Sequence, residues 1–293
     1  MQLLDGKIAS SFYKQEIKAK VAAHVASGKK APHLAAIIAG NDGASEAYVG
    51  NKIKTCNEIG FESTLIRLSA DVTQSELLKH IDGLNNNPAI DGFIVQMPLP
   101  KQINVQQVTE AIQPAKDVDG FHPINNGRMM QQQPCYLPAT PKGILLLLDY
   151  YKIDTQGKHC VILGRSNIVG GPMSVLMSRK ASPGNCTVTL CHSGSKNITH
   201  FVQQADIVIA ALGQPYYVKA DMIKEGAVVI DVGITRVTDT TNTKGYRLAG
   251  DVDFENVKDK CSYITPVPGG VGLMTIVGLL QNTYSAAIKE VFS

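Results

Sequence analysis

The sequence is short of charge and has no concentrated basic segment. Only 18% of its 293 residues are charged, the formal net charge is +3, and no run of lysine or arginine exceeds a pair. Proteins that bind nucleic acid usually gather basic residues on one segment or face, so we expect no nucleic-acid partner. The hydrophobic content of 44% is sufficient for a packed core and excludes a disordered chain.

Long apolar segments and a secretory leader are also missing. Apolar runs such as Ile144–Leu148 are far shorter than the roughly 20 residues needed to cross a bilayer. The segment Met1–Lys7 lacks a basic stretch followed by an apolar core, so we expect no signal peptide and no membrane partner. The six cysteines form no CxxC pair and no cysteine/histidine metal spacing. We therefore expect a cytoplasmic protein with reduced cysteines and no bound metal.

The chain length favours two domains, because single hydrophobic cores rarely grow beyond roughly 250–300 residues. The first half alternates helical patterns with short buried strands, which we expect near residues 34–39, 63–68 and 91–96. Ser45 and Thr73 are candidate caps for the helices between these strands. This alternation predicts an α/β fold with a parallel sheet covered by helices on both faces. No internal repeat occurs at a fixed period.

A proline-rich segment from residue 114 to 141 interrupts the alternation. It contains five prolines and shows little periodicity, and a long irregular segment inside a compact protein usually serves function. We place the domain boundary at its end. The predicted domains are an N-terminal α/β catalytic domain, 1–140, completed by a C-terminal helix, 275–293, and a second domain, 141–274, with a cleft between the two.

A glycine-containing turn follows the strand expected at 160–163. Gly164 ends this strand, and Gly170 and Gly171 open the next helix. Glycine in such a turn lets a phosphate approach the backbone, and the helix N-terminus supplies free N–H groups. Ser166 stands where the second glycine of a GxGxxG motif would be, so the motif is incomplete. Further alternating strands and helices, to about residue 232, place the turn in a Rossmann-like dinucleotide-binding domain.

The residues after the next expected strand, 187–191, favour NADP over NAD. An NAD site normally has an acidic residue there to bind the ribose hydroxyls. Here the strand is followed by His192 and Ser193, with Lys196 nearby and no acid. Arg165 in the glycine turn could hold a 2′-phosphate through charge-assisted hydrogen bonds. The alternative is that Arg165 is merely a solvated turn residue.

A pair of residues in the first half is a candidate catalytic cluster. Tyr48 and Lys52 are four residues apart and therefore share one face of the expected helix, beside its apolar stripe. A partly desolvated lysine has a lowered pKa and can carry protons near neutrality. Gln96 lies at the end of an expected strand, and Asp119 lies in the proline-rich segment. Spacing alone equally allows a surface lysine beside an aromatic ring.

Several longer segments together resemble the bifunctional methylenetetrahydrofolate dehydrogenase/cyclohydrolase family, over essentially the whole chain. They match in the family's order, which makes the resemblance specific. The matching segments are Tyr48–Lys52, Gln96–Pro100, Lys116–Phe121, Gly164–Gly170, Cys191–Ser193 and Pro266–Gly272.

The resemblance implies two reactions in one-carbon metabolism. The family oxidises 5,10-methylenetetrahydrofolate to the methenyl form with NADP⁺, and then hydrolyses it to 10-formyltetrahydrofolate. By similarity, Lys52 would assist proton movement around the attacking water, Gln96 would hold Lys52, and Asp119 would bind the pteridine N–H groups. Tyr48 would pack on the aminobenzoyl group, and the other substrate-binding residues implied are Ser45, Pro98, Gly269 and Gly270.

The same resemblance implies a homodimer, tetrahydrofolate derivatives as substrates and a set of NADP contacts. The cofactor-binding residues carried over by position are Thr140, Gly164, Arg165, Ser166, Ile168, His192, Ser193, Gly213, Ile234 and Thr275. Two positions depart from the family pattern: Ala139 stands where cysteine is usual and Leu273 where proline is usual. Neither removes a chemical group that the reactions require, although Leu273 could reshape the folate pocket.

Three alternatives remain at this point. A monofunctional dehydrogenase would have lost the lysine chemistry, but Tyr48, Lys52, Gln96 and Asp119 are all present. A two-lobed binding protein without catalysis would share the domain pattern. A dehydrogenase acting on an amino acid or shikimate is possible on fold grounds, since fold does not fix function.

Overall fold

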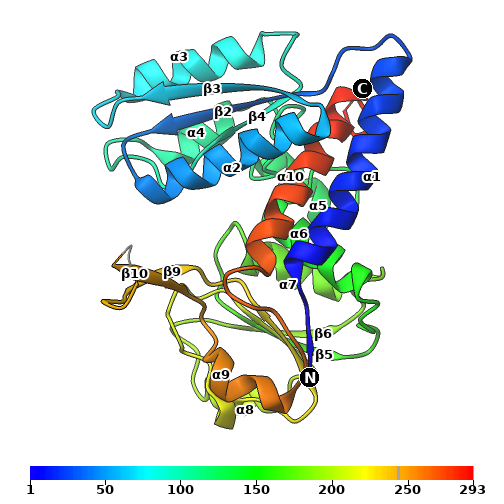
Figure 1. Cartoon of the computed structure of the whole chain (residues 1–293), viewed down its shortest axis with the longest axis vertical. Helices are drawn as coiled ribbons and strands as arrows, with labels where there is room; N and C mark the ends of the chain where they lie inside the picture. The colour runs from blue at the N-terminus through cyan, green and yellow to red at the C-terminus, as the bar shows by residue number, and fades with distance from the viewer. Residues whose placement is uncertain (243–244, 293) are drawn as a thin grey trace. The chain divides into compact units, whose positions relative to one another are not determined.

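The computed structural model describes residues 1–242 and 245–292, which group into two compact units (Figure 1). Unit 1 consists of Met1–Ser11 and Thr140–Thr275, and unit 2 of Phe12–Ala139 and Ile276–Ser293. We expected residues 1–140 to form one domain, but Met1–Ser11 group with unit 1. The reason is β1 (Gln2–Leu3), which pairs with a strand of the unit 1 sheet. No helix in the described part of the chain is long and apolar enough to cross a membrane.

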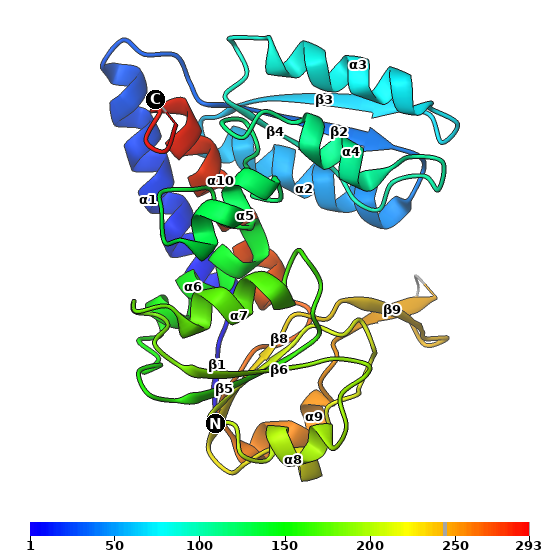
Figure 2. The ribbon, with the colours of Figure 1, turned by 180° about the vertical axis from the view of Figure 1, so that it is seen from behind.

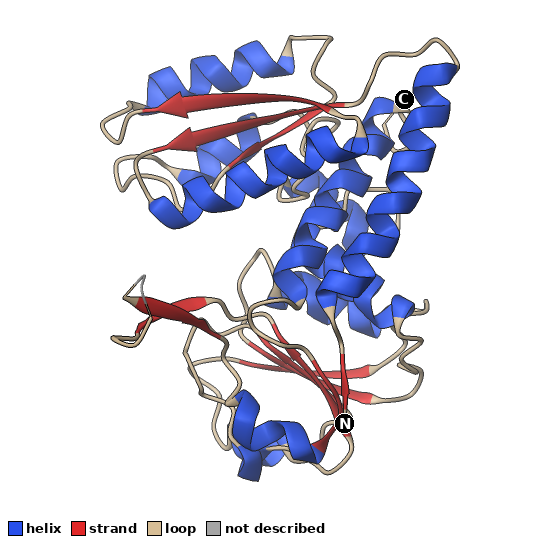
Figure 3. Cartoon of the chain, in the orientation of Figure 1, coloured by secondary structure: helices blue, strands red, loops and turns tan. Residues whose placement is uncertain are grey.

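Unit 1 is built on a six-stranded parallel sheet, as the alternating pattern predicts (Figure 3). The strands in its middle are short and wholly buried, which is typical of a parallel sheet covered on both faces, whereas the edge strand Gln2–Leu3 is exposed. Their order is β1, β11 (Cys261–Ile264), β8 (Ala227–Asp231), β7 (Ile207–Ala210), β5 (His159–Leu163) and β6 (Thr187–Cys191).

Helices cover the two faces of this sheet (Figure 2). One face carries α6 (Ala139–Tyr150) and α7 (Gly170–Ser178). The other carries α8 (Ile198–Val202) and α9 (Phe254–Val257), whose Val202 and Val257 pack in one apolar cluster with strand residues. An antiparallel hairpin of β9 (Thr235–Thr238) and β10 (Tyr246–Ala249), which periodicity did not predict, follows β8.

Unit 2 contains a three-stranded parallel sheet in the order β3 (Glu62–Leu68), β2 (His33–Ala39), β4 (Gly92–Val95). Its helices are α2 (Gly43–Ile59), α3 (Gln74–Asn85), α4 (Val105–Ala111) and α5 (Pro123–Met130). Two longer helices, α1 (Gly6–Ala26) and α10 (Val271–Ala287), begin in unit 1 and end in unit 2. The parallel order brings the carboxyl ends of all three strands to one edge of the sheet.

Two expectations about local structure were wrong. Ser45 does not cap α2, because the helix begins at Gly43 and the Asp42 carboxylate accepts the backbone N–H of Ser45 at 2.8 Å. Nor is the segment 114–141 irregular throughout. Pro123 occupies the first turn of α5, where its missing N–H costs nothing, and the His122 side chain accepts the N–H of Ile124 to cap the helix. The Thr73 cap of α3 is confirmed, with a complete capping box.

A histidine ties together the amino ends of the three strands of unit 2. The backbone N–H of His33, at the start of β2, donates to Asp91 Oδ2 at 2.8 Å, and the N–H of Asp91 donates back to the His33 carbonyl. On the other side, Nε2 of His33 lies 2.9 Å from Thr64 Oγ1 in β3. Lys30 adds an ion pair to Asp91 at 2.5 Å. This histidine clasp therefore links β2 to both of its neighbours.

The same clasp recurs in unit 1. The backbone N–H of His159, at the start of β5, donates to Asp206 Oδ2 at 2.9 Å, and the N–H of Asp206 donates back to the His159 carbonyl. Nε2 of His159 lies 2.9 Å from Thr189 Oγ1 in β6. Lys224 pairs with Asp206 at 2.5 Å. The two clasps differ in sequence spacing, since Asp91 lies 58 positions after His33 but Asp206 lies 47 positions after His159. The two sheets thus share a module that a search for a fixed period does not detect.

Replacing Asp206 tests the strength of this clasp. Asp206→Ala leaves the N–H of His159 without its acceptor and removes the partner of Lys224. We expect the free energy of unfolding, measured by urea denaturation, to fall by about 1–2 kcal/mol. The exposed Asp259 provides a control, and Asp259→Ala should stay within about 0.5 kcal/mol of the wild type. Equal stability of the two variants would contradict a structural role for the clasp.

Candidate active site and nucleotide turn

Lys52 is a buried lysine on α2. Its side chain is 4% exposed, and Nζ donates a 3.3 Å hydrogen bond to Oε1 of Gln96, the residue after β4. One helical turn earlier, the Tyr48 ring lies with its centroid 4.5 Å from the same Nζ. The structure thus brings together three residues that sequence spacing could only suggest. Tyr48 covers the ammonium group while Gln96 fixes its direction.

Burial and charge act on Lys52 in opposite directions. Removal from water lowers its pKa below the usual 10.5, while the negative charge of Asp119 raises it. Burial likewise raises the pKa of Asp119, and the neighbouring Lys52 lowers it. The thiol of Cys56, one turn further along α2, has its pKa raised to about 12 by burial and stays protonated. Burial therefore moves the pKa of the Cys56 thiol away from neutrality and that of Lys52 toward it.

Gln96 is held so that its oxygen faces the lysine. Its Nε2 donates to the backbone carbonyl of Met97 at 2.6 Å, which leaves Oε1 to accept from Lys52. Its backbone N–H donates to the carbonyl of Ile37 in β2. Pro98, a predicted substrate contact, follows in a cis peptide bond and is exposed. The end of β4 thus fixes a side chain that the sequence alone left undistinguished.

Asp117 shapes the loop that carries Asp119. It is 1% exposed and accepts hydrogen bonds from the backbone N–H groups of Phe121 and His122 and from the side-chain amide of Asn125. Burial nevertheless raises the pKa of Asp117 to about 7. The hydrogen bonds that Asp117 accepts come from residues 121–125, so it fixes the conformation of this segment. Asp117 stabilises the loop through its hydrogen bonds, whereas Asp119 interacts with Lys52 through its charge.

The nucleotide turn of unit 1 lies at the carboxyl end of β5. Gly164 has φ +107°, and a Cβ at Gly170 would lie 1.9 Å from the Gly164 carbonyl oxygen, so the turn closes only with glycine at both positions. Ser166 fixes the turn, since its Oγ accepts the N–H of Val169 and its carbonyl accepts that of Gly171. Among the described residues α7 has no side-chain cap, which leaves its amino end suited to an anion.

The other predicted cofactor residues also lie in unit 1. Arg165, Ile168, Ser193, Gly213 and Ile234 are exposed. His192 is half-buried, and its Nδ1 accepts the N–H of Gly194 in the turn after β6. Thr140 and Thr275 are in direct contact through a 3.1 Å hydrogen bond between their hydroxyl groups.

The predicted substrate residues divide between the units. Tyr48, Lys52, Gln96 and Asp119 belong to unit 2, as do Pro98 and Ser45, whose buried hydroxyl donates to Asp42. Gly269 and Gly270 belong to unit 1, in the loop before α10. The two residues that depart from the family pattern lie in different surroundings. Ala139 is buried and donates its N–H to the Asp119 carbonyl, whereas Leu273 is 36% exposed on α10.

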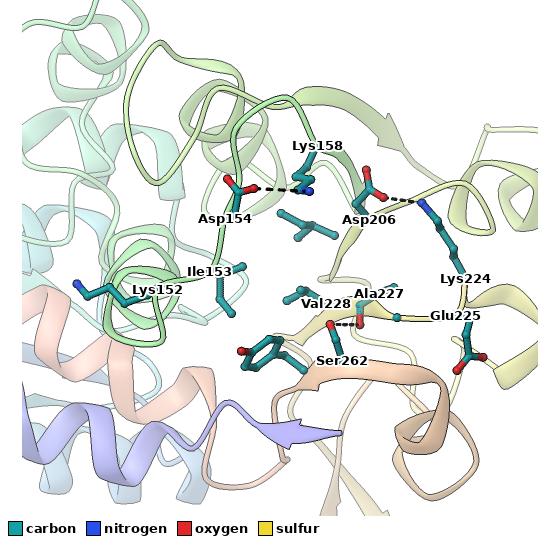
Figure 4. Close-up of a pocket in the computed structure, with 13 residues that line it drawn as sticks. Lys152, Ile153, Asp154, Lys158, Asp206, Lys224, Glu225, Ala227, Val228 and Ser262 are labelled. Carbon is teal, nitrogen blue, oxygen red and sulfur yellow. Dashed lines mark hydrogen bonds and ion pairs between the residues drawn. The ribbon is translucent and has the colours of Figure 1, made fainter.

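A cavity of 330 Å³ lies at the opposite, amino-terminal edge of the unit 1 sheet (Figure 4). Two ion pairs line it, with Lys158 3.6 Å from Asp154 and Lys224 2.5 Å from Asp206. Charge is therefore largely balanced within the cavity itself. In the described ranges, no group of three or more histidine, cysteine or acidic residues is placed to hold a metal.

Comparison with known proteins supports the reading of both units. The profile of the tetrahydrofolate dehydrogenase/cyclohydrolase catalytic domain matches residues 4–119, and that of the same family's NAD(P)-binding domain matches residues 138–291. The bifunctional protein FolD of Phocaeicola vulgatus is 61% identical over 292 residues, covering 100% of both chains.

Two solved structures are also similar over nearly their whole length. The bifunctional FolD enzyme of Campylobacter jejuni has 44% identity and a TM-score of 0.92, with 99% of each chain covered. The Trypanosoma brucei dehydrogenase–cyclohydrolase, solved with NADP and an inhibitor, has 36% identity and a TM-score of 0.92, with 99% of this chain and 98% of that chain covered.

These findings define a two-domain α/β enzyme with a catalytic domain and a Rossmann-like NAD(P)-binding domain. The chain belongs to the tetrahydrofolate dehydrogenase/cyclohydrolase family. It is a bifunctional enzyme of one-carbon metabolism, with methylenetetrahydrofolate dehydrogenase and methenyltetrahydrofolate cyclohydrolase activities. The family expectation from the sequence is confirmed.

The balance of burial and charge at Lys52 can be measured directly. A protein labelled with ¹³C at lysine Cε should show a resonance that titrates below pH 10.5 and is missing from Lys52→Met, whereas the resonance of Lys116, whose pKa burial also lowers, should remain in that variant. Asp119→Asn should move this midpoint lower still, because the charge that favours the ammonium form is gone. A midpoint that rises in Asp119→Asn would contradict the assigned interaction.

Proposed function

We propose that Lys52 is the proton-carrying group of the cyclohydrolase reaction, with Gln96 and Asp119 as its partners. The observation that carries the proposal is a lysine 4% exposed whose Nζ donates to Gln96 at 3.3 Å. In hydrolysis, water adds to the methenyl carbon and loses a proton, and the bond from that carbon to N5 then breaks to leave the formyl group on N10. A lysine with lowered pKa can take the proton from the water and return one to N5.

The charge of the substrate supports this assignment. The methenyl intermediate is a cation, and a permanently charged lysine beside it would be unfavourable in a site of low polarity. Burial lowers the pKa of Lys52 and so favours its neutral form. Asp119 acts in the opposite direction and prevents the lysine from losing its basicity altogether. We assign Asp119 also to the pteridine N–H groups and Tyr48 to the aminobenzoyl group of the folate.

We further propose NADP as the cofactor of the dehydrogenase. When bound, NADP⁺ supplies the hydride acceptor for the methylene carbon, and the transfer needs alignment rather than a protein acid. The residues present fit this cofactor: the closed glycine turn, the uncapped start of α7 and the exposed Arg165 suit phosphate groups. No acid stands at residues 191–196 to repel a 2′-phosphate. The similar Trypanosoma brucei enzyme was solved with NADP.

The division of labour between the domains is part of the same proposal. Residues to 140, with the end of α10, would bind the folate, and residues 141–274 would bind the nucleotide. Two pairs of residues are exceptions to this division: Gly269 and Gly270 are assigned to the folate, and Thr140 and Thr275 to NADP. The cytoplasmic location, the homodimer and the effect of Leu273 stay predictions from the sequence.

Lys52→Met separates the two activities. We expect hydrolysis of methenyltetrahydrofolate, followed by its absorbance, to fall to the rate in buffer, because the proton carrier is gone. Reduction of NADP⁺ with methylenetetrahydrofolate should persist. The exposed Lys54 on the same helix provides the control, and Lys54→Met should keep both activities. Hydrolysis that survives in Lys52→Met would show that another group carries the proton.

Arg165→Ala tests the choice of cofactor. The loss of a charge-assisted contact to the 2′-phosphate should raise KM for NADP⁺ by about tenfold or more, with a much smaller effect for NAD⁺. Lys180→Ala, a change of charge at an exposed residue beyond the end of α7, should leave both constants unchanged. Equal increases for NADP⁺ and NAD⁺ in Arg165→Ala would refute the phosphate role.

A further inference from the structure

A fully buried aspartate holds the loop that follows β7. Asp251 is 0% exposed, and its carboxylate accepts three successive backbone N–H groups: Oδ2 accepts those of Leu212 at 2.5 Å and Gly213 at 3.0 Å, and Oδ1 accepts that of Gln214 at 2.8 Å. Successive N–H groups that point at one centre form an anion-binding turn. In this loop the protein supplies the anion, so the turn is fixed before any ligand arrives.

A second buried aspartate fixes the first. Asp231, at the end of β8, accepts the backbone N–H of Asp251 through Oδ1 and that of Val252 through Oδ2, each at 2.9 Å. The backbone of this segment also holds the far side of the loop, because the N–H of Tyr216 donates to the carbonyl of Gly250. The end of β8 is thus connected to the loop after β7 through two carboxylates in series.

Space for both carboxylates depends on a glycine. A Cβ at Gly250 would lie 1.9 Å from Asp231 Oδ2, a distance that no side chain could occupy without moving the carboxylate. Gly250 is therefore required by close approach. A second position, Gly233, is equally tight, since a Cβ there would lie 2.4 Å from Asp251 Oδ1. The surroundings thus accommodate the two aspartates and little else.

The loop that Asp251 fixes adjoins the nucleotide turn. A Cβ at Gly164 would lie 2.1 Å from the carbonyl oxygen of Ala211, the residue immediately before the loop. The N–H of Ala211 donates to the carbonyl of Leu163, so β7 and β5 reach the same edge together. Residues 212–214 therefore continue from a point in close contact with the glycine turn.

We propose that Asp251 is a positioning residue of the dehydrogenase, which acts on cofactor binding through the backbone of residues 212–214, with Asp231 as its anchor. The inference rests on the proposed contact between Gly213 and the cofactor. Gly213 has φ +67° and open space where a Cβ would lie, and its N–H is held by the Asp251 carboxylate. Loss of the carboxylate would release the loop without removing any group that touches the substrate.

Asp251→Asn is the direct test, because it keeps the shape of the side chain and replaces one acceptor oxygen with an N–H₂ group. We expect KM for the nicotinamide cofactor to rise by about tenfold, the effect of one lost hydrogen bond to a charged group. The rate of methenyltetrahydrofolate hydrolysis without nucleotide should stay within about twofold, because Lys52 lies in the other unit. A purely structural role would lower both activities together, and that result would overturn the proposal.

Two further variants complete the experiment. Asp253→Asn makes the same change of charge two residues away, at a side chain paired with Lys219, and should leave KM within about twofold. Gly213→Ala disfavours the left-handed loop conformation without touching either carboxylate, and should raise KM by about fivefold. If Asp251→Asn fails to fold, the KM of Gly213→Ala becomes the test, and a KM for the cofactor that is unchanged in Gly213→Ala overturns the proposal.

The cofactor preference of the wild type shows whether a failed prediction counts against the positioning role or against the choice of NADP. All KM values are measured with the nicotinamide cofactor that the wild type uses with methylenetetrahydrofolate. A wild type that reduces NAD⁺ but not NADP⁺ would refute the cofactor proposal and leave the role of Asp251 open to the same three variants. A wild type that reduces NADP⁺, with KM unchanged in Asp251→Asn, would refute the positioning role alone.

Discussion

The chemistry of unit 2 depends on keeping water away from one amine. Lys52 would be an ordinary cation on the surface of a helix, but here its Nζ faces Tyr48 and Gln96 and is almost wholly buried. Desolvation disfavours the ammonium form, and the nearby Asp119 restores part of what is lost. Without the loop folded by Asp117, that restoring charge would have no fixed place. The helix α2, the end of β4 and the loop that carries Asp119 therefore together set the pKa of Lys52, which burial lowers and the charge of Asp119 raises.

Periodicity and turn residues predict much of the fold, because they report on local backbone geometry. The buried strands, the glycine turn at Gly164 and the Thr73 cap are examples. The same signals fail where a tertiary contact decides. The two residues of β1 form a strand only because β11 lies beside them. Pro123 looks like a helix breaker in the sequence but begins α5.

The candidate site shows the same limit in a different way. The spacing of Tyr48 and Lys52 predicts a shared helix face, yet only the folded chain shows Gln96 at hydrogen-bonding distance. Asp231 is an acidic residue at the end of a buried strand, and this position is a signal of a functional or structural role that the sequence itself contains. Asp251 gave no comparable signal, since its three hydrogen bonds join residues 37 to 39 positions away along the chain. Long-range backbone contacts of this kind leave no pattern in the local sequence.

The histidine clasps at the amino ends of the two sheets make their first βα loops directly comparable. Gly40 follows β2 and Gly164 follows β5, both have positive φ, and each donates its N–H to the carbonyl of the last residue of a neighbouring strand. The loops differ in length and in how the next helix begins: the Asp42 carboxylate caps α2, whereas Val169 precedes α7 without a side-chain cap in the described chain. One module thus carries a built-in negative charge where the other presents bare amide groups. The Asp42 carboxylate repels a phosphate and the free amide groups at the start of α7 attract one, so of these two loops the one after β5 is suited to a nucleotide.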